Sequence, residues 1–389
     1  MKKALVIANA ASMIHLFNEE NIRLLRENNY EVHVVCNFYD GNTTSPEIVE
    51  ECRKRWEKDG IVCHQVDFKR TPFSFKQISV YSSIKKIIKE NNFDIIHCHT
   101  PITSVLTRLA ARKSRRQGTK VIYTAHGFHF YKGASFINWL IYFTCEWICS
   151  FFTDVLLTIN EEDFKRAGKY MHSGLVEYIP GVGIDLYTID EIPDSAKNMP
   201  EEFGITNETV ILSVGEININ KNHEVIIRAL AGIDKPYKYI ICGKGDKTEY
   251  LKDLAKKLGV QDKVILTGYR SDVKELLACV DIFCFPSYRE GLSVSLMEAM
   301  ASRLPVIASD IRGNVDLIDS GKGGFLYSPG NVEGFREGLS KFMDNPEIMD
   351  EFGEYNHEKI KNFTKEIVSD KMRKFYFGDT VRAKEKAEI

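Results

Sequence analysis

The chain has 389 residues, of which 44% are hydrophobic and 27% charged. This length suits about two or three domains, and the composition excludes a disordered or low-complexity chain. The 52 basic and 54 acidic residues nearly balance, so the net charge gives no drive toward nucleic acid. Nine scattered cysteines without a Cys-x-x-Cys pair argue against a disulfide framework or a zinc site. They favour a reduced, cytoplasmic compartment.

The chain begins with a short apolar run, residues 4–8, after a pair of lysines. This run is shorter than the roughly 7 to 15 residues of a signal-peptide core, so it predicts a first β-strand instead. From there, short apolar runs alternate with helical patterns along the whole chain. Such runs are typical of parallel strands that helices cover on both faces. The pattern occurs in both halves of the chain and predicts two α/β units.

Residues 179–198 interrupt this alternation. Pro180, Gly181 and Gly183 stand close together there, and a polar stretch follows. Glycines beside a proline allow the chain to bend, so we interpret the segment as a hinge between domains, with a plain surface loop as the alternative. The prediction is a first domain over 1–190, a second over 191–360, and a terminal segment over 361–389.

Two neighbouring segments of the first half have an unusual composition. Residues 108–120 hold six basic residues and no acidic one. Residues 136–152 are aromatic and apolar, with Glu146 as their only charge, and lead directly into the next predicted strand. One hypothesis is a helix that dips into a membrane surface beside a basic patch. The alternative is a core helix beside a solvated basic face.

The strongest group of candidate functional residues lies in the second half. A predicted strand, residues 282–285, leads into a loop with Glu290 and Gly291, and a helix is expected to begin at Leu292 or Ser293. Ligands of open α/β sheets bind beyond the carboxyl ends of the strands. The free N–H groups of a helix start favour an anion there. Glu298 follows inside the helix, where a second carboxylate suits a ribose.

At these residues the sequence resembles glycosyltransferase family 4, the retaining enzymes with the GT-B fold. The Glu-x7-Glu pattern of that family is present as EGLSVSLME over residues 290–298, followed by AMASRLPVIAS. In the first half, DIIHCHTP, KVIYTAHGFHFYKG and VLLTINEEDFKRA look like the enzymes of bacterial capsule and exopolysaccharide synthesis. The resemblance implies two Rossmann-like domains that face a central cleft, the first binding the acceptor and the second a nucleotide sugar. It also implies a C-terminal helix that crosses back to the first domain.

The resemblance further implies roles for individual residues. Glu290 would hold hydroxyls of the transferred sugar, Glu298 would bind ribose, and Lys221 would neutralise the diphosphate leaving group. No metal and no other cofactor is then expected, because a lysine supplies the cation. The remaining residues expected at the donor are Gly291, Leu292 and Ser293, whose amides would meet the diphosphate, with Gly215, Glu216, Gly243 and Arg270.

Glu216 departs from the family pattern, since most relatives have an arginine at this place. A carboxylate does not clamp a diphosphate. Either Arg270, Arg289 or Lys244 supplies the second positive charge, or Glu216 has another purpose, such as orienting Lys221.

In the first half, His126 ends a predicted strand. The resemblance gives it a supporting catalytic role beside the donor sugar or the acceptor. Asn9 and Ser12 follow the first strand, where an acceptor would approach. His97 and His99 end the preceding strand, where a histidine is more often structural, and His129 is ambiguous.

The reaction that these expectations describe is transfer of a hexosyl or N-acetylhexosaminyl group from a UDP-sugar to a lipid-linked saccharide, with retention. The product would serve surface polysaccharide synthesis. The enzyme would be cytoplasmic and peripheral at the inner face of the membrane, which it would contact through residues 108–120 and 136–152. The alternatives are a UDP-sugar 2-epimerase on the same scaffold and a non-catalytic binding subunit.

Overall fold

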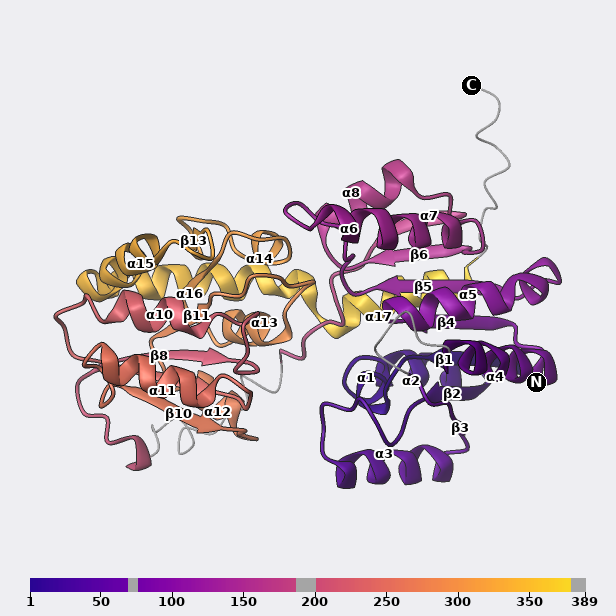
Figure 1. Ribbon diagram of the computed structural model, residues 1–389, viewed down its shortest axis with the longest axis horizontal. Helices are drawn as coiled ribbons and strands as arrows, with labels where there is room; N and C mark the ends of the chain where they lie inside the picture. Colours follow the sequence, from indigo (N-terminus) through magenta and orange to yellow (C-terminus); the bar gives the residue numbers. More distant parts are fainter. Residues whose placement is uncertain (69–75, 187–200, 379–389) are drawn as a thin grey trace. The chain divides into compact units, whose positions relative to one another are not determined.

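The computed structural model describes residues 1–68, 76–186 and 201–378. The chain divides into two compact units, one made of Met1–Val182 with the segment from Lys365 onward and the other of Gly183–Thr364 (Figure 1). The domain boundary expected at residue 190, with much of the expected hinge, lies outside the described residues. The same is true of the terminal tail after residue 378.

The first unit is built on a seven-stranded parallel sheet in the order β3-β2-β1-β4-β5-β6-β7. Ala4 to Ala8 are completely buried, which explains why the first strand reads as a continuous apolar run. The strands are β1 (Lys2–Ile7), β2 (Tyr30–Cys36), β3 (Val62–Gln65), β4 (Ile95–His99), β5 (Lys120–Ala125), β6 (Val155–Thr158) and β7 (Leu175–Tyr178). The helices are α1 (Ala11–Phe17), α2 (Glu19–Glu27), α3 (Pro46–Lys58), α4 (Lys76–Asn91), α5 (Pro101–Arg116), α6 (Phe136–Asn138), the π-helical turn η1 (Trp139–Phe143), α7 (Thr144–Ser150), α8 (Glu161–Tyr170) and α17 (Lys365–Phe377).

The second unit is built on a six-stranded parallel sheet in the order β10-β9-β8-β11-β12-β13. Along β11, Phe283 and Phe285 pack into one hydrophobic cluster, whereas Ile282 and Cys284 pack into another. Successive residues of a strand point to opposite faces, so this strand is buried on both. The strands are β8 (Thr209–Val214), β9 (Tyr237–Cys242), β10 (Val264–Gly268), β11 (Ile282–Phe285), β12 (Val306–Ser309) and β13 (Gly324–Tyr327). The helices are the 3₁₀ turn η3 (Glu201–Phe203), α10 (His223–Leu230), α11 (Thr248–Lys257), α12 (Val273–Leu277), α13 (Val294–Ala301), α14 (Asn314–Leu317), α15 (Val332–Asp344), α16 (Pro346–Ile360) and the 3₁₀ turn η4 (Lys361–Phe363).

Both sheets therefore confirm the predicted pair of Rossmann-like units. In each sheet the strand order reverses beside the first strand of the unit, between β1 and β4 and between β8 and β11. The loops after two such strands diverge, which leaves a crevice for a ligand at the carboxyl edge. These two places are where the candidate residues are expected.

The C-terminal helix α17 belongs to the first unit, as expected. Lys120 Nζ donates hydrogen bonds to the carbonyl groups of Phe375, Tyr376 and Gly378, at 3.2, 3.1 and 3.1 Å. Carbonyl groups at a helix end lack partners within the helix and attract a cation. Lys120 therefore fastens the end of α17 to the sheet and does not extend the basic surface that was expected over 108–120.

Arg108 is a second correction to that basic surface. Its side chain is buried, donates to Glu146 at 2.7 Å and stacks over the ring of Tyr123 at 4.2 Å. The single acid of the aromatic segment thus faces inward as the partner of a buried arginine. Arg115 pairs with Asp154 at 3.0 Å. The exposed basic residues that remain in 108–120 are Arg112, Lys113 and Arg116.

The aromatic segment itself is not one regular helix but the succession α6, η1 and α7. Over the parts of the chain that the structure describes, no helix combines the length and the apolar character needed to cross a bilayer.

Candidate active site

Lys221 and Glu290 meet at the carboxyl edge of the second sheet. Lys221 follows β8, Glu290 follows the neighbouring β11, and Lys221 Nζ lies 2.8 Å from Glu290 Oε1. The lysine ammonium group also lies 4.7 Å from the ring centre of Phe285. The two side chains are only 18% and 15% exposed, so their charges interact with little screening. The fold thus brings together the two residues to which the family resemblance gives roles at the leaving group and the sugar.

Two glycines make room for the lysine. A Cβ atom on Gly215 would lie 3.0 Å from Lys221 Cε, and one on Gly243 would lie 1.8 Å from the carbonyl oxygen of Gly215. A side chain at either place would displace the lysine stem or the strand ends. We conclude that these glycines shape the site through close packing.

Glu216 takes part in the hydrogen bonds that hold the loop before α10. Asn218 Nδ2 donates to Glu216 Oε2 at 2.8 Å, and the backbone N–H of Lys221 donates to Asn218 Oδ1 at 3.0 Å. The loop is also tied to the next one, because Tyr288 N–H donates to the Asn220 carbonyl group at 2.8 Å. Of the alternatives for Glu216, these contacts favour orientation of Lys221.

Three cations were candidates to replace the missing arginine. Arg270 already donates to Asp272 at 2.8 Å and to Glu202 at 2.5 Å. Lys244 and Arg289 are exposed. The side chain of Arg270 is thus already paired with carboxylates, whereas those of Lys244 and Arg289 extend into solvent.

Arg312 is a cation near the site that sequence reasoning missed. It is only 7% exposed, and its Nε donates to the carbonyl oxygen of Glu290 at 3.1 Å. It stands three residues after β12, so its place just beyond an apolar run could have revealed it. Arg312 holds the backbone of the loop that carries Glu290.

Helix α13 begins at Val294, just after the expected start, because Ser293 is its cap. Ser293 Oγ accepts a hydrogen bond from Leu296 N–H at 3.4 Å. The N–H groups of Gly291, Leu292 and Ser293 donate to no other group among the described residues. Free amides before a helix are a binding place for an anion. Glu298 lies one turn inside the helix and is partly buried.

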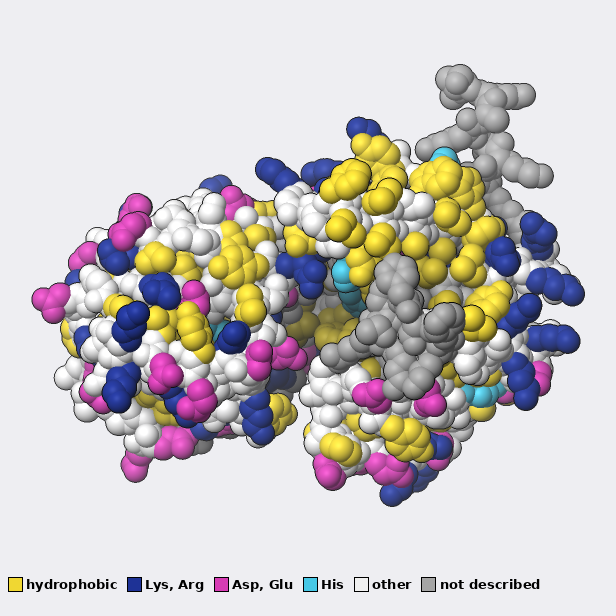
Figure 2. Space-filling view, in the orientation of Figure 1, with side chains coloured by type: hydrophobic (Ala, Val, Ile, Leu, Met, Phe, Trp, Pro, Cys, Tyr) yellow, Lys and Arg dark blue, Asp and Glu magenta, His cyan; other side chains and the backbone are white. Residues whose placement is uncertain are grey.

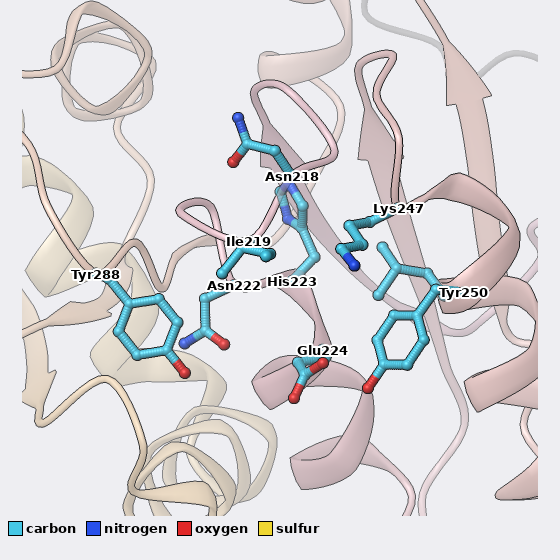
Figure 3. A pocket seen from close by; sticks show the side chains of 9 residues that line it. Asn218, Ile219, Asn222, His223, Glu224, Lys247, Tyr250 and Tyr288 are labelled. Carbon is cyan, nitrogen blue, oxygen red and sulfur yellow. The ribbon is translucent and has the colours of Figure 1, made fainter.

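A cavity of about 310 Å³ opens beside the loop that carries Lys221. Figure 3 shows Tyr288 and Tyr250 on opposite sides of it, with Asn222 and His223 between them. His223 is only 3% exposed, and burial lowers its pKa to about 4. The sequence gives no sign that His223 is buried, because polar residues flank it on both sides.

In the first unit, the expected acceptor residues lie at the carboxyl edge of the other sheet. Ser12 is buried and held by the loop after β2, since its Oγ accepts from Thr43 N–H at 3.1 Å and its N–H donates to Asn42 Oδ1 at 2.9 Å. Asn9 Oδ1 is buried without a hydrogen-bond partner. The residues stand where expected, but Ser12 is occupied by contacts within the protein.

The histidines of this edge form a group. His126 Nε2 lies 3.0 Å from His99 Nδ1, and the ring of His129 stacks on Tyr142. His97 bonds to the Tyr376 hydroxyl at 2.6 Å and to Thr124 Oγ1 at 2.8 Å, as expected of a structural histidine. Burial lowers the pKa of His126 to about 4 and that of His97 to about 3. At neutral pH the imidazoles of His126 and His97 are therefore uncharged.

For metal binding, the described residues contain no group of three or more His, Cys, Asp or Glu side chains placed around one point. The nine cysteines are all unpaired.

Comparison with known proteins agrees with this architecture. Residues 195–359 match the family described as glycosyl transferases group 1, and residues 3–160 match the family described as glycosyl transferase 4-like. The chain is 34% identical to the putative glycosyltransferase EpsD of Bacillus subtilis (strain 168) over 96% of both proteins. It is 27% identical to the UDP-Gal:alpha-D-GlcNAc-diphosphoundecaprenol alpha-1,3-galactosyltransferase of Escherichia coli over 69% of the chain and 71% of that protein. Among solved structures, Anabaena HepE in complex with UDP and glucose superposes with a TM-score of 0.78 at 18% identity, covering 97% of this chain and 99% of that one.

The two Rossmann-like parallel-sheet units, together with the family matches over both halves of the chain, identify a glycosyltransferase of the GT-B type. More particularly, the chain belongs to the family of the group 1 and 4-like glycosyltransferases.

Proposed function

We propose that this enzyme transfers a hexosyl or N-acetylhexosaminyl group from a UDP-sugar to a lipid-linked saccharide, with retention, in the synthesis of a surface polysaccharide. The observation that carries the proposal is the Lys221–Glu290 pair beside the free amides of residues 291–293. An ammonium group and unpaired N–H groups together suit the negative charge that develops on a departing diphosphate.

The roles of the two charged side chains follow from their contacts. When a donor binds, its diphosphate competes with Glu290 for the Lys221 ammonium group. The released carboxylate then accepts hydrogen bonds from hydroxyl groups of the sugar. In a front-face reaction, the departing diphosphate oxygen helps to take the proton of the incoming hydroxyl group. The sugar carbon passes through an oxocarbenium-like state without a covalent enzyme intermediate.

Uridine and a lipid carrier are proposed from the relatives. The Escherichia coli enzyme named above uses UDP-Gal and a diphosphoundecaprenol acceptor, according to its name. Anabaena HepE was crystallised with UDP. These names support a UDP-sugar donor and a lipid-linked acceptor for this chain.

A lipid-linked acceptor requires contact with a membrane, and the first unit has a suitable surface. The segment over α6, η1 and α7 exposes large apolar side chains, including Phe136 at 79%, Ile137 at 65% and Leu140 at 60%. Figure 2 shows hydrophobic side chains gathered on this part of the molecule. Arg112, Lys113 and Arg116 are exposed at the end of α5, which packs against α7. Apolar insertion and attraction to anionic lipid would act together at such a surface, which supports the proposal that the enzyme works at the inner face of the cell membrane.

The proposed reaction uses no metal ion, because Lys221 supplies the positive charge at the leaving group. Chelation with EDTA is therefore expected to leave the rate of transfer unchanged. A rate that falls with EDTA and returns with a divalent cation would contradict this part of the proposal.

The test is an assay of UDP release from a panel of UDP-sugars, with and without a lipid-linked saccharide acceptor. We expect release that depends on the acceptor, and a product whose anomeric configuration, read by NMR, matches that of the donor. Glu290→Gln should abolish most of the activity, whereas Glu249→Gln, an exposed carboxylate on α11, should leave it unchanged. Conversion of the donor alone into an epimer, without acceptor, would instead support a 2-epimerase. Unchanged activity in Glu290→Gln would show that the role given to this carboxylate is wrong.

A further inference from the structure

Three histidines lie in a row at the carboxyl edge of the first sheet. His97 and His99 belong to the end of β4, and His126 directly follows the neighbouring β5. The ring centres of His97 and His99 are 4.1 Å apart, and those of His99 and His126 are 5.3 Å apart. The inner histidine, His97, uses both of its ring nitrogens in hydrogen bonds to Tyr376 and Thr124.

His99 and His126 share one hydrogen bond, and their other ring nitrogens differ in environment. His99 Nε2 is buried and has no hydrogen-bond partner. His126 Nδ1 makes no hydrogen bond within the described residues and, unlike His99 Nε2, is not completely enclosed, although most of the ring is buried. A ligand at this edge of the sheet can therefore reach it.

Both rings are neutral at physiological pH. Burial lowers the pKa of His126 to about 4, and burial together with its histidine neighbours lowers the pKa of His99 well below its usual range. A neutral imidazole has one N–H group and one bare nitrogen. In the 3.0 Å contact between His99 Nδ1 and His126 Nε2, one ring donates and the other accepts.

The buried end of His99 decides which ring donates. If His126 donated, the proton of His99 would sit on Nε2, as a buried N–H group without an acceptor. Buried N–H groups without a partner are rarer in proteins than unsatisfied acceptors. We infer that His99 donates its Nδ1–H to His126 Nε2, and thereby fixes His126 in the tautomer that carries its proton on Nδ1.

The consequence is a neutral hydrogen-bond donor at Nδ1 of His126, the ring nitrogen that is not completely enclosed. The next step rests on the proposed function: this N–H group donates a hydrogen bond to a hydroxyl or phosphate oxygen of the bound substrates. His99 is then a positioning residue, since it acts through His126 and does not touch the substrate. The other tautomer would present a bare nitrogen, which repels a phosphate oxygen and binds a hydroxyl group only by accepting its proton.

The test is a long-range ¹H–¹⁵N spectrum of the full-length protein labelled with ¹⁵N-histidine, because protonated and bare ring nitrogens resonate in separate regions. The His126 signals are assigned by their loss in His126→Gln. Two variants of nearly equal size separate the donor from packing. His99→Asn keeps an amide N–H near the place of Nδ1, whereas His99→Leu has no donor.

We expect the wild-type spectrum to show the proton of His126 on Nδ1. His99→Leu should give a mixture of tautomers and lower kcat/KM by about five- to tenfold, as for loss of one hydrogen bond. His99→Asn should restore both the tautomer and the activity.

A wild-type proton on Nε2 of His126, or an unchanged tautomer in a folded His99→Leu, would overturn the inference. If the spectrum shows Nδ1–H but no UDP-sugar supports transfer, the tautomer inference stands and the proposed function fails.

Discussion

Lys221 Nζ and Glu290 Oε1 are separated by 2.8 Å although the residues lie 69 positions apart in the chain. Their pairing is a property of the β8–β11 contact, which brings the two loops together at the switch point of the second sheet. Without a donor, the Lys221 ammonium group and the Glu290 carboxylate are hydrogen-bond partners of each other. In the proposed reaction, the diphosphate of the donor competes with Glu290 for the lysine.

Lys221→Met removes the cation and keeps most of the length of the side chain. We expect kcat to fall by about 100- to 1,000-fold, the range seen when one electrostatic stabiliser of a developing anion is lost. Because both residues act on one reaction step, Lys221→Met with Glu290→Gln should be far less than additive. Steady-state kinetics of the single and double variants provide the measurement. Strictly additive losses would show that the two side chains act independently.

Glu216 is predicted to act by orienting the loop that carries Lys221. Glu216→Gln keeps an oxygen that accepts the hydrogen bond of Asn218, so its activity should stay near that of the wild type. Glu216→Leu loses the acceptor, and we expect kcat/KM to fall by about two- to tenfold, as for one hydrogen bond. If both variants lose activity equally, the negative charge itself matters and the orienting role is wrong.

The buried pair of Arg108 and Glu146 predicts a strong effect on stability. Both side chains are at most 6% exposed, so Arg108→Met leaves the Glu146 carboxylate buried with the Tyr123 hydroxyl as a neutral partner and without a cation. We expect the free energy of unfolding of the first unit to fall by about 3–5 kcal/mol. The double variant Arg108→Met with Glu146→Leu should recover much of this loss, because no unpaired charge remains. Urea unfolding followed by fluorescence tests this, and a double variant less stable than Arg108→Met would contradict it.

The apolar surface over α6, η1 and α7 predicts membrane binding. The protein should sediment with vesicles that contain anionic lipid, and high salt should weaken this binding by screening Arg112, Lys113 and Arg116. Phe136→Ser with Leu140→Ser should reduce the bound fraction. Tyr39→Ser serves as the control, since Tyr39 is 75% exposed on the loop after β2. Absence of sedimentation at low salt would contradict the membrane hypothesis. It would not contradict the proposed transfer reaction itself.

The buried histidines predict that stability falls in mild acid. The pKa of His126 and of His223 is about 4 in the folded protein, against 6.5 for an ordinary histidine. The unfolded chain therefore binds protons first as the pH falls, so the loss begins near pH 6.5 and grows until about pH 4. Each such histidine contributes a slope of about 1.4 kcal/mol per pH unit. Urea midpoints between pH 7.5 and 4.5 measure this loss of stability. His223→Asn should flatten the dependence of the second unit's stability on pH. An unchanged slope in that variant would show that His223 titrates normally.

The sequence was sufficient to predict the two parallel sheets, because strands buried on both faces leave continuous apolar runs. It also located the strand at residues 282–285 and the helix after it to within two residues. The start of α13 differs from the expected one because Ser293 caps the helix instead of joining it.

The surface of the first unit was predicted less well. The six basic residues within 108–120 gave no sign that the Arg108 side chain is buried, because its partner Glu146 lies 38 positions away. Charge along a sequence shows how many charges there are, and packing decides which of them reach solvent.

The sequence by itself determined the order of strands and helices and the identity of the residues beyond each strand, since these depend on local patterns of apolar side chains and turns. The tertiary structure decided which of those residues meet: Lys221 with Glu290, Arg312 with the Glu290 backbone, and His99 with His126. Such pairs form only when parallel strands align side by side, and no local pattern encodes the distance between two loops.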